Sequence, residues 1–319
     1  MNVELLIQNG SKVYAPVVEE GIVWETERKD SPGKLTFTVI KDQEINFTEG
    51  NPVRLVVDGV KLFYGFIFSK KRDKQQNIKV TAYDQLRYLK NKDTYVYTNK
   101  TASDFIKMVA NDYNLNLGAI ENTSFIIASR IEDNTTLIDM IQNALDLELM
   151  NKKTMYVLYD DFGKLTLKAL ERMKLGVVID EETGENFDYT SSIDSQTYNK
   201  IKLVYENEKT GKREVYIAQD SNNINNWGIL QYYDTLQEGE NGQAKVDALL
   251  SLYNAKTRNL KITNAFGHLQ VRAGSMVVVN LNLGDVAVQN FMLVERCKHT
   301  FNESEHKMDL TLRGGEFIA

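Results

Sequence analysis

The chain contains few of the residues that build disulfide frameworks, long linkers or membrane spans. Its 319 residues include one cysteine, three prolines and 19 glycines. A single cysteine excludes an intrachain disulfide and a cysteine-rich zinc site. No apolar stretch approaches the ~20 residues that cross a bilayer as a helix, and the N-terminus lacks the basic start and apolar core of a secretory signal. These absences predict closely joined domains and a protein without membrane anchoring that is made and assembled in the cytoplasm.

Charge shows no strong excess of either sign. The 38 lysines and arginines face 44 aspartates and glutamates, for a formal net charge of −6. The two signs are interspersed, whereas a nucleic-acid binder normally has a clustered basic face. We interpret the basic run 70–77 as a solvated hairpin tip, with nucleic-acid binding as the weaker alternative. With 42% hydrophobic and 26% charged residues, the composition is typical of a globular protein of two or three domains.

Histidine is also scarce, and the common catalytic fingerprints are missing. Only His268, His299 and His306 are available for acid–base chemistry, and there is no phosphate-binding glycine loop, dinucleotide fingerprint or nucleophile elbow. Cys297 and His299 are two residues apart in a strand-like run and therefore point to one face. A thiol nucleophile beside a base is conceivable there, but no orienting partner or oxyanion donor is identifiable. We interpret Cys297 as a buried small hydrophobe.

Four residues near the C-terminus have side chains of the kind that bind metals. His299, Glu303, Glu305 and His306 offer nitrogen and oxygen donors. Their spacing crosses a hairpin tip and matches none of the closed zinc patterns, so an exposed turn is the better interpretation. The sequence therefore predicts no metal site and no bound cofactor.

Two acidic segments offer carboxylates for hydrolysis. A glycosidase needs two acids held at a defined separation, which the adjacent Asp160 and Asp161 on a hairpin turn do not provide, and aspartate and glycine are common turn residues. We predict no catalytic residue. A peptidoglycan hydrolase using Asp160, Asp161 or the acidic segment 180–188 stays open as an alternative, for which changing one carboxylate would abolish lysis.

The most informative feature of the sequence is a β-unit that is repeated, at 49–84 and at 273–314. Each unit has a glycine, a strand, a turn (expected at 58–59 and 283–285), an aromatic strand, a polar loop and a last strand. Gly50 precedes Phe66 by 16 positions, and Gly274 precedes Phe291 by 17. A fold duplicated within one chain suggests an oligomer that needs quasi-equivalent copies around a ring.

Periodicity predicts an α+β fold that is mostly β. Alternation at 35–40 is typical of a half-buried strand, and the chain up to about residue 88 is predicted to be β. Apolar stripes predict helices that begin near 101 and 134, then a hairpin at 154–168, a loop at 181–195 and a helix at 243–257. The expected division is a first β-barrel at 1–90, an α+β insert at 91–190, and at 191–319 a second β-barrel decorated by a hairpin and a helix.

Several runs resemble one protein family. The chain is similar to the XkdQ/YqbQ-type baseplate hub proteins of contractile phage tails and phage-tail-like bacteriocins, which are related to the late control protein D group. The similarity covers essentially the whole chain, and its specificity comes from the order of degenerate motifs. These motifs are Phe47-Thr-Glu-Gly-Asn-Pro-Val-Arg-Leu, Leu62-Phe-Tyr-Gly-Phe-Ile, Val80-Thr-Ala-Tyr-Asp-Gln-Leu-Arg-Tyr-Leu, Ile224-Asn-Asn-Trp-Gly with the helix at 244–252, and His306-Lys-Met-Asp-Leu-Thr-Leu.

The resemblance implies a non-enzymatic structural role in a baseplate. Each chain would contribute two tail-tube-like β-barrels, and a homotrimer would present six, adapting a six-fold tail tube to a three-fold spike. Such rings use interfaces that close on rotation. The implied partners are the spike protein, the tail tube protein and other baseplate proteins, with DNA at most passing through the lumen. The implied location is the baseplate of a virion or phage-tail-like particle.

A third interpretation is a carbohydrate-binding module at the tail tip. It expects exposed aromatic residues at loop ends, whereas most of the 16 tyrosines and 13 phenylalanines lie within predicted strands. Tyrosine and phenylalanine are also enriched at protein interfaces. The hub therefore remains the favoured interpretation.

Overall fold

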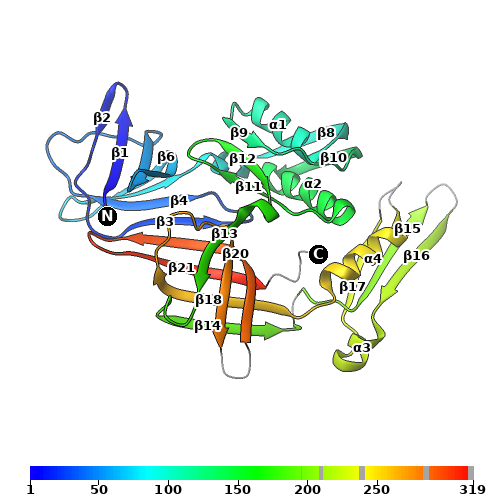
Figure 1. Cartoon of the computed structure of the whole chain (residues 1–319). Coiled ribbons are helices and arrows are strands. Elements are labelled where there is room, and N and C mark those ends of the chain that lie inside the picture. The colour runs from blue at the N-terminus through cyan, green and yellow to red at the C-terminus, as the bar shows by residue number, and fades with distance from the viewer. Residues whose placement is uncertain (195, 208–210, 237–240, 283–286, 315–319) are drawn as a thin grey trace.

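The computed structural model describes residues 1–194, 196–207, 211–236, 241–282 and 287–314, and it is mostly β (Figure 1). The α-helices are α1 (Ala102–Asp112), α2 (Leu137–Lys152), α3 (Ser221–Trp227) and α4 (Gly242–Tyr253), with short 3-10 helices η1 (Gln85–Lys90) and η2 (Leu170–Met173). The strands are β1 (Val3–Asn9), β2 (Lys12–Tyr14), β3 (Ile22–Glu27), β4 (Lys34–Val39), β5 (Pro52–Val57), β6 (Val60–Arg72), β7 (Ile78–Tyr83), β8 (Lys92–Lys100), β9 (Leu117–Ile120), β10 (Ile127–Thr136), β11 (Tyr156–Asp160), β12 (Leu165–Ala169), β13 (Lys174–Ile179), β14 (Asn186–Ser192), β15 (Lys200–Asn207), β16 (Lys212–Gln219), β17 (Gln231–Thr235), β18 (Thr257–Phe266), β19 (Met276–Asn282), β20 (Ala287–Phe301) and β21 (His306–Gly314).

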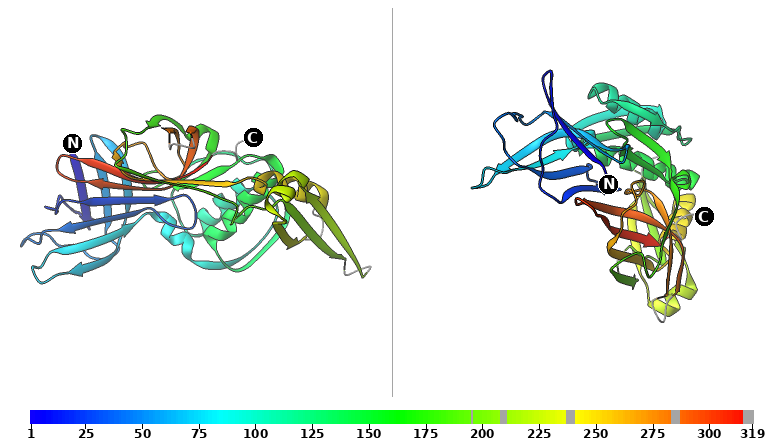
Figure 2. Two further views of the ribbon diagram at one scale, coloured as in Figure 1. Left: turned by 90° about the horizontal axis from the view of Figure 1, so that it is seen from below. Right: turned by 60° about the vertical axis from the view of Figure 1, so that its left-hand side comes forward.

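Thirteen strands form one continuous sheet through the middle of the molecule. The main path is β14-β18-β21-β20-β3-β4-β7-β6-β5-β1-β2, while β19 pairs with β20 and with β13. Among the described residues this path is open, with β14 and β2 at its two ends. Seen from below, the molecule is elongated, with β15–β17 and α4 at one end (Figure 2). The predicted fold class, α+β and mostly β, is confirmed.

The strand pairing reproduces the predicted repeat. Copy 1 has the spatial order β1-β5-β6-β7-β4-β3, and copy 2 has the order β13-β19-β20-β21-β18-β14. The copies differ at one edge, where β1 runs antiparallel to β5 but β13 runs parallel to β19. Each copy buries its own apolar cluster against the inner face of its strands.

The same backbone turn opens the repeated unit in both copies. Gly50 and Gly274 have φ of +85° and +88°, a region that favours glycine because it has no Cβ. The amide of Gly50 donates to the carbonyl of Ile67 at 2.7 Å, and the amide of Gly274 donates to the carbonyl of Val294 at 2.8 Å. Ile67 and Val294 are therefore equivalent positions, and a register shift follows each of them.

The detailed alignment of the repeat differs from the prediction. Phe66 pairs with Pro52, which lies two residues after Gly50. Leu293 pairs with Met276, which lies two residues after Gly274. Phe66 is therefore equivalent to Leu293 and not to Phe291, because the β19–β20 hairpin is longer than the β5–β6 hairpin. The turn expected at 283–285 lies outside the described residues.

An α+β insert lies between the two copies. The helices expected near 101 and 134 are α1 and α2, and the expected hairpin is β11–β12. Thr101 begins α1 with a capping box, in which its hydroxyl and the Asp104 carboxylate each accept from the other residue's amide. The predicted order of helix, helix and hairpin was incomplete, because β8 pairs with β10 and β9 extends the β11–β12 hairpin.

The loop predicted at 181–195 is wrong for 186–192. That segment is β14, which pairs along its whole length with β18. Its polar composition hid an alternation in which Phe187 and Tyr189 pack against the core of copy 2, while Asp188 and Thr190 are exposed. A strand that has one face on the core and the other in solvent requires only that apolar and polar residues alternate.

A second insert separates β14 from β18. It contains β15–β17, α3 and α4, with its own small core, and α4 lies where the sequence predicted a helix at 243–257. In the ranges that the structure describes, no helix combines the length and the hydropathy needed to cross a bilayer.

Candidate functional site at the junction of the two copies

One antiparallel strand pair joins copy 2 to copy 1. Residues 296–301 of β20 pair with residues 22–27 of β3, whereas the earlier half of β20 pairs with β19. The Thr26 hydroxyl oxygen accepts from the Ala273 amide at 2.9 Å, which ties the loop before β19 to β3. The main sheet therefore continues from one copy into the other.

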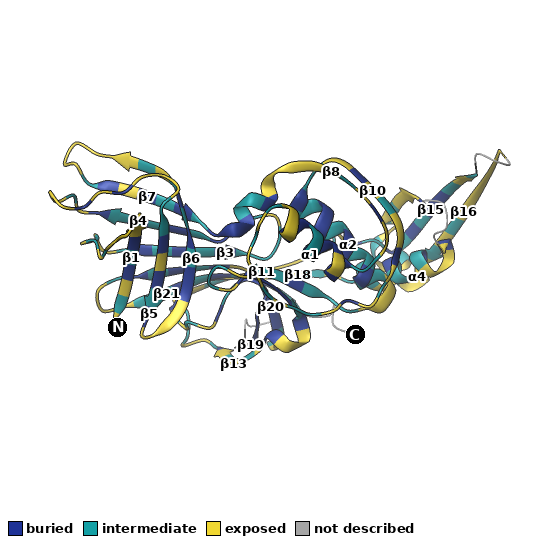
Figure 3. Cartoon of the chain, turned by 90° about the horizontal axis from the view of Figure 1, so that it is seen from above, coloured by how far each residue is buried: buried dark blue, intermediate teal, exposed yellow. Residues whose placement is uncertain are grey.

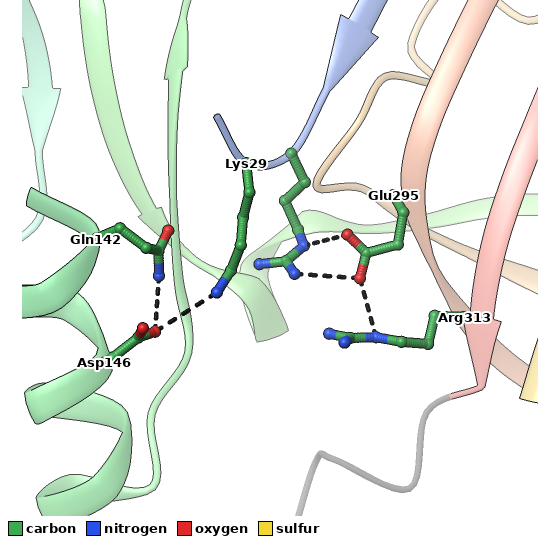
Figure 4. Close-up of polar contacts among 6 residues, drawn as sticks. Lys29, Gln142, Asp146, Glu295 and Arg313 are labelled. Carbon is green, nitrogen blue, oxygen red and sulfur yellow. Dashed lines mark hydrogen bonds and ion pairs between the residues drawn. The ribbon is translucent and has the colours of Figure 1, made fainter. Parts of the chain in front are cut away.

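Ion pairs cross the same junction. Arg28 makes two hydrogen bonds to Glu295, with Nε 2.7 Å from Oε2 and Nη2 3.1 Å from Oε1. Arg313 Nε lies 2.9 Å from the same carboxylate, as Figure 4 shows. Arg296 Nε lies 3.4 Å from Glu27 across the strand pair. Two-point arginine–carboxylate pairs are among the stronger polar contacts, and the Arg28 side chain is only 6% exposed.

The insert touches this junction through a weaker contact. Lys29 Nζ lies 3.6 Å from Asp146 Oδ1 on α2, and Gln142 Nε2 donates to the same carboxylate at 2.7 Å (Figure 4). The Lys29 and Asp146 side chains are 36% and 43% exposed. Solvent screens such a pair, so it adds at most ~1 kcal/mol to stability.

Two buried aspartates lie where both copies meet the insert. Asp84, directly after β7, accepts from the Gly33 amide at 2.9 Å and from the Leu86 amide at 3.0 Å. Asp160, at the end of β11, accepts from the Gly163 amide at 2.6 Å and from Gln85 Nε2 at 2.8 Å. Because their oxygens are occupied by amide donors, these carboxylates organise turns.

Arg272, in the loop before β19, supplies the positive charge beside them. Its Nη1 donates to the backbone carbonyl of Asp160 at 3.0 Å, and its guanidinium stacks 4.2 Å from the centroid of the Tyr159 ring. Its Nε is shielded from solvent and has no hydrogen-bond partner among the described residues. Burial raises the pKa of Asp84, the charge of Asp160 raises it further, and Arg272 opposes the rise. Burial lowers the pKa of Arg272.

Cys297 and His299 do meet on one face, as their spacing predicts. The two side chains are 3.1 Å apart, between Sγ and Nε2. His299 Nε2 also lies 2.8 Å from the Val271 carbonyl, and its Nδ1 lies 2.9 Å from His306 Nε2. Burial raises the pKa of the Cys297 thiol, which disfavours the thiolate that a nucleophile needs. Both side chains are fully buried, so they form a structural cluster stacked against Trp24.

The histidine pair predicts a loss of stability in acid. Burial lowers the pKa of His299 to about 3 and that of His306 to about 4, whereas an unfolded histidine titrates near ~6.5. The unfolded chain therefore binds more protons as pH falls below ~6.5, and stability declines by up to ~1.4 kcal/mol per pH unit for each histidine. We expect the unfolding midpoint of a variant with both histidines changed to glutamine to depend less on pH between ~6.5 and ~4.5. Urea unfolding at several pH values measures this dependence. If the unfolding midpoints of the two proteins changed equally with pH, the lowered pKa values of His299 and His306 would not be the cause.

The four candidate metal ligands do not converge. His299 and His306 direct their ring nitrogens at each other, while Glu303 and Glu305 are exposed at the β20–β21 turn. Glu305 pairs with Lys307 at 3.1 Å. Within the described ranges there is no group of three or more histidine, cysteine or acidic side chains able to hold a metal ion.

The candidate hydrolytic carboxylates are likewise separated. Asp160 is buried, whereas Asp161 is exposed at the turn. In the acidic segment 180–188, Glu181 accepts from the Asn282 amide at 3.3 Å and the remaining exposed acids lie along the surface. Sequence reasoning missed Asp84, whose pKa is raised by the charge of Asp160, because 76 positions separate the two residues and neither belongs to a recognised motif.

Solved structures with the same fold include phage tail proteins. The chain superposes on the prophage MuSo2 43 kDa tail protein of Shewanella oneidensis with a TM-score of 0.74, at 11% identity, covering 99% of this chain and 100% of the other. It superposes on the Escherichia coli c3393 protein with a TM-score of 0.60, at 9% identity, covering 99% of this chain and 78% of the other. That protein is described as a type VI secretion component that resembles the T4 tail proteins gp27 and gp5. The chain therefore has a fold that phage tail proteins also have.

Sequence comparison defines the family. The YQBQ-like family model matches residues 22–313, and the chain belongs to this family. The Bacillus subtilis protein YqbQ is 32% identical over 310 residues, which cover 93% of this chain and 92% of YqbQ. The phage-like element PBSX protein XkdQ of the same organism is 29% identical over 309 residues, which cover 93% of each chain. The family resemblance predicted from the sequence is confirmed.

Proposed function

We propose that the chain is the hub subunit of a contractile-tail baseplate. Three copies form a ring of six quasi-equivalent β-units that joins the tail tube to the central spike. The single observation that supports this most strongly is the repeat: one chain holds two copies of the same six-strand order, already joined edge to edge through β20 and β3. A ring of three such chains offers six similar surfaces to a tube and three to a spike.

The division of the chain in this proposal follows the strand pairing. Copy 1 spans roughly the first 90 residues, the insert follows it, and copy 2 begins with β13, because β13 and β14 pair with β19 and β18. Each copy corresponds to one tail-tube-like barrel. The insert also offers a contact surface, since Val96 and Ile131 oppose each other on β8 and β10 and are 65% and 70% exposed.

The role is structural and needs no catalytic residue. The acids that a hydrolase would use are either engaged in turns, as Asp160 is, or exposed on the surfaces of the insert and of copy 2. The proposed partners are the spike protein, the tube protein and neighbouring baseplate proteins, and the proposed location is the baseplate of the particle. DNA at most passes through the lumen.

Mass photometry tests the ring. The purified chain, alone or with the spike protein of the same particle, should give a species containing three times the 36.5 kDa chain mass. A closed three-fold ring is the reason, because each chain offers complementary edges that rotation brings together. A single-chain mass under both conditions would contradict the proposal.

A further inference from the structure

Among the described residues, the outer edge of β14 and the last part of β6 are two of the edges of the large sheet that have no partner strand. β14 is the last strand at one end of the path and pairs only with β18. β6 pairs with β5 only up to Phe66, so its last residues, 69–72, pair with β7 on one side alone. Both segments are largely exposed, and Figure 3 shows exposed residues in yellow at the outer end of the hairpin that leads into β7. Unpaired edges of this kind are templates for another strand.

The repeat specifies which strand each edge accepts. Residues 69–72 of β6 occupy the positions of residues 296–299 of β20, counted from the equivalent Ile67 and Val294. Residues 189–192 of β14 occupy the positions of residues 24–27 of β3, counted from the equivalent pairs Tyr189–Leu260 and Trp24–Leu35. Within the chain, 296–299 and 24–27 are paired with each other.

We propose that residues 69–72 of β6 in one chain pair antiparallel with residues 189–192 of β14 in a second copy of the same chain. This inference rests on the proposed ring and specifies its interface between chains. The register follows from the junction inside the chain, where Lys298 opposes Glu25. Lys71 of one chain therefore opposes Thr190 of the next, and Arg72 opposes Tyr189.

The loop beside the edge leaves room for the incoming strand. In copy 2, the loop before β19 contacts β20 through the Val271 carbonyl, 3.8 Å from Cys297 Sγ, and β3 still pairs with β20. In copy 1, the equivalent loop contacts β6 in the same way, with Lys70 Nζ donating to the Phe47 carbonyl at 2.6 Å. The covering loops are thus equivalent, and the edge of β6 is as accessible as the edge that β3 occupies.

The hydroxyl of Thr26, which forms a hydrogen bond at the junction of β20 and β3, has a counterpart on β14. Thr26 accepts from the Ala273 amide, which immediately precedes Gly274. Ser191 on β14 is equivalent to Thr26, and Glu49, which immediately precedes Gly50, is equivalent to Ala273. Ser191 is exposed in the single chain. Its hydroxyl is positioned to accept from the Glu49 amide of the neighbouring chain.

Charge complementarity supports the same partner. The end of β6 and its hairpin tip carry Lys70, Lys71, Arg72 and Lys74 with one acid, whereas the segment 180–188 before and within β14 carries five acids and no base. Among the described residues, Lys71, Arg72 and Lys74 have no ion pair, and neither do the five acids. In the proposed register the two segments lie side by side, and opposite charges steer and orient such an encounter.

Closure of the ring follows from the same pairing. Eight strands, from β14 to β6 along the main path, lie between the two edges of one chain. Three chains joined by the β6–β14 pairing would therefore contribute three times eight strands, or 24, to one closed barrel. A closed barrel leaves no free edge.

Disulfide trapping tests the register. A K71C/T190C chain, whose native Cys297 is fully buried, is oxidised at the concentration used for mass photometry and run without reductant. Directly opposed strand residues have Cβ atoms close enough for a disulfide. We expect covalent dimers and trimers at about tenfold the yield of a K71C/S129C control, in which the second cysteine lies at an exposed position on β10.

The outcomes separate this inference from the proposed function. A trimer by mass photometry in which K71C/T190C gives no more cross-linking than the control would overturn the β6–β14 pairing and leave the ring in place. A single-chain mass with and without the spike would overturn both. A trimer with the selective cross-link supports both.

Charge exchange gives a second test that does not depend on oxidation. The K71E/R72E chain should dissociate at a concentration about tenfold higher than the unchanged chain, because the end of β6 that lies beside the acidic segment 180–188 then carries the same sign of charge. Adding E185K/D188K to the same chain should restore most of the affinity, because Asp188 is the diagonal neighbour of residue 71 in the proposed register. Equal dissociation of all three proteins would overturn the proposal, and far-UV circular dichroism checks that each variant is folded.

Discussion

Replacing Arg272 with methionine is expected to destabilise the folded chain by about 3 kcal/mol, the largest effect of any single charge removal that we predict. Methionine retains much of the stacking on Tyr159 but removes the charge that opposes Asp84 and Asp160. Two buried carboxylates then remain without a cation, and an uncompensated buried charge is far costlier than a lost surface pair. Urea unfolding at neutral pH measures the effect.

The dependence on pH identifies the mechanism of this loss. Because burial raises the pKa of Asp84 and of Asp160, both carboxyls become neutral in the folded chain before they do so in the unfolded chain. The difference in the free energy of unfolding between the variant and the unchanged protein should therefore become smaller as the pH falls into the acidic range. A D84N/R272M double variant should recover part of the stability.

An exposed arginine provides the matched control. Arg54 on β5 is 47% exposed and its Nη2 lies 3.4 Å from Glu4. Changing Arg54 to methionine should cost less than ~1 kcal/mol. An Arg272 variant as mild as this one, or a loss that does not vary with pH, would refute a charge-balancing role.

Substitution of the two equivalent glycines by alanine should have unequal effects. Both Gly50 and Gly274 have positive φ, which costs an alanine about 1–2 kcal/mol. A Cβ at Gly50 meets nothing within 4 Å, whereas a Cβ at Gly274 would lie 2.4 Å from Cγ1 of Val157 on β11. Gly274→Ala should therefore cost about 1–3 kcal/mol more than Gly50→Ala, since an overpacked core must shift.

The steric part of that difference can be measured separately. Changing Val157 to alanine removes the methyl groups that a new Cβ would strike. In a double-mutant cycle, V157A and G274A should be less harmful together than the sum of the single changes, by at least ~1 kcal/mol. Additive losses would show that the contact between the insert and copy 2 adjusts without strain.

Several elements were predictable because their signals are local. The helices α1, α2 and α4 have apolar stripes of helical period, and Thr101 adds a capping residue. The repeated unit was visible because each copy needs a glycine with positive φ before its hairpin. The interpretation of Cys297 as a buried small side chain was also correct.

Other features were not predictable from local patterns. Strand β14 has a polar, acidic composition, and only pairing with β18 identifies it as part of the sheet. The equivalence of Phe66 and Leu293 depends on hairpin lengths that the aromatic pattern does not report. The electrostatic effect of Arg272 on Asp84 and Asp160 joins three segments that lie far apart in the chain.

The amino-acid sequence by itself determined the α+β class, the duplicated unit and the membership of a phage-tail family, because these depend on periodicity and on the order of motifs along the chain. Only the tertiary structure decided that the copies join through β20 and β3, and that β6 and β14 are left with open edges. Strand pairing is a long-range choice, set by which edges meet after every face has found its core. No window of neighbouring residues contains that information.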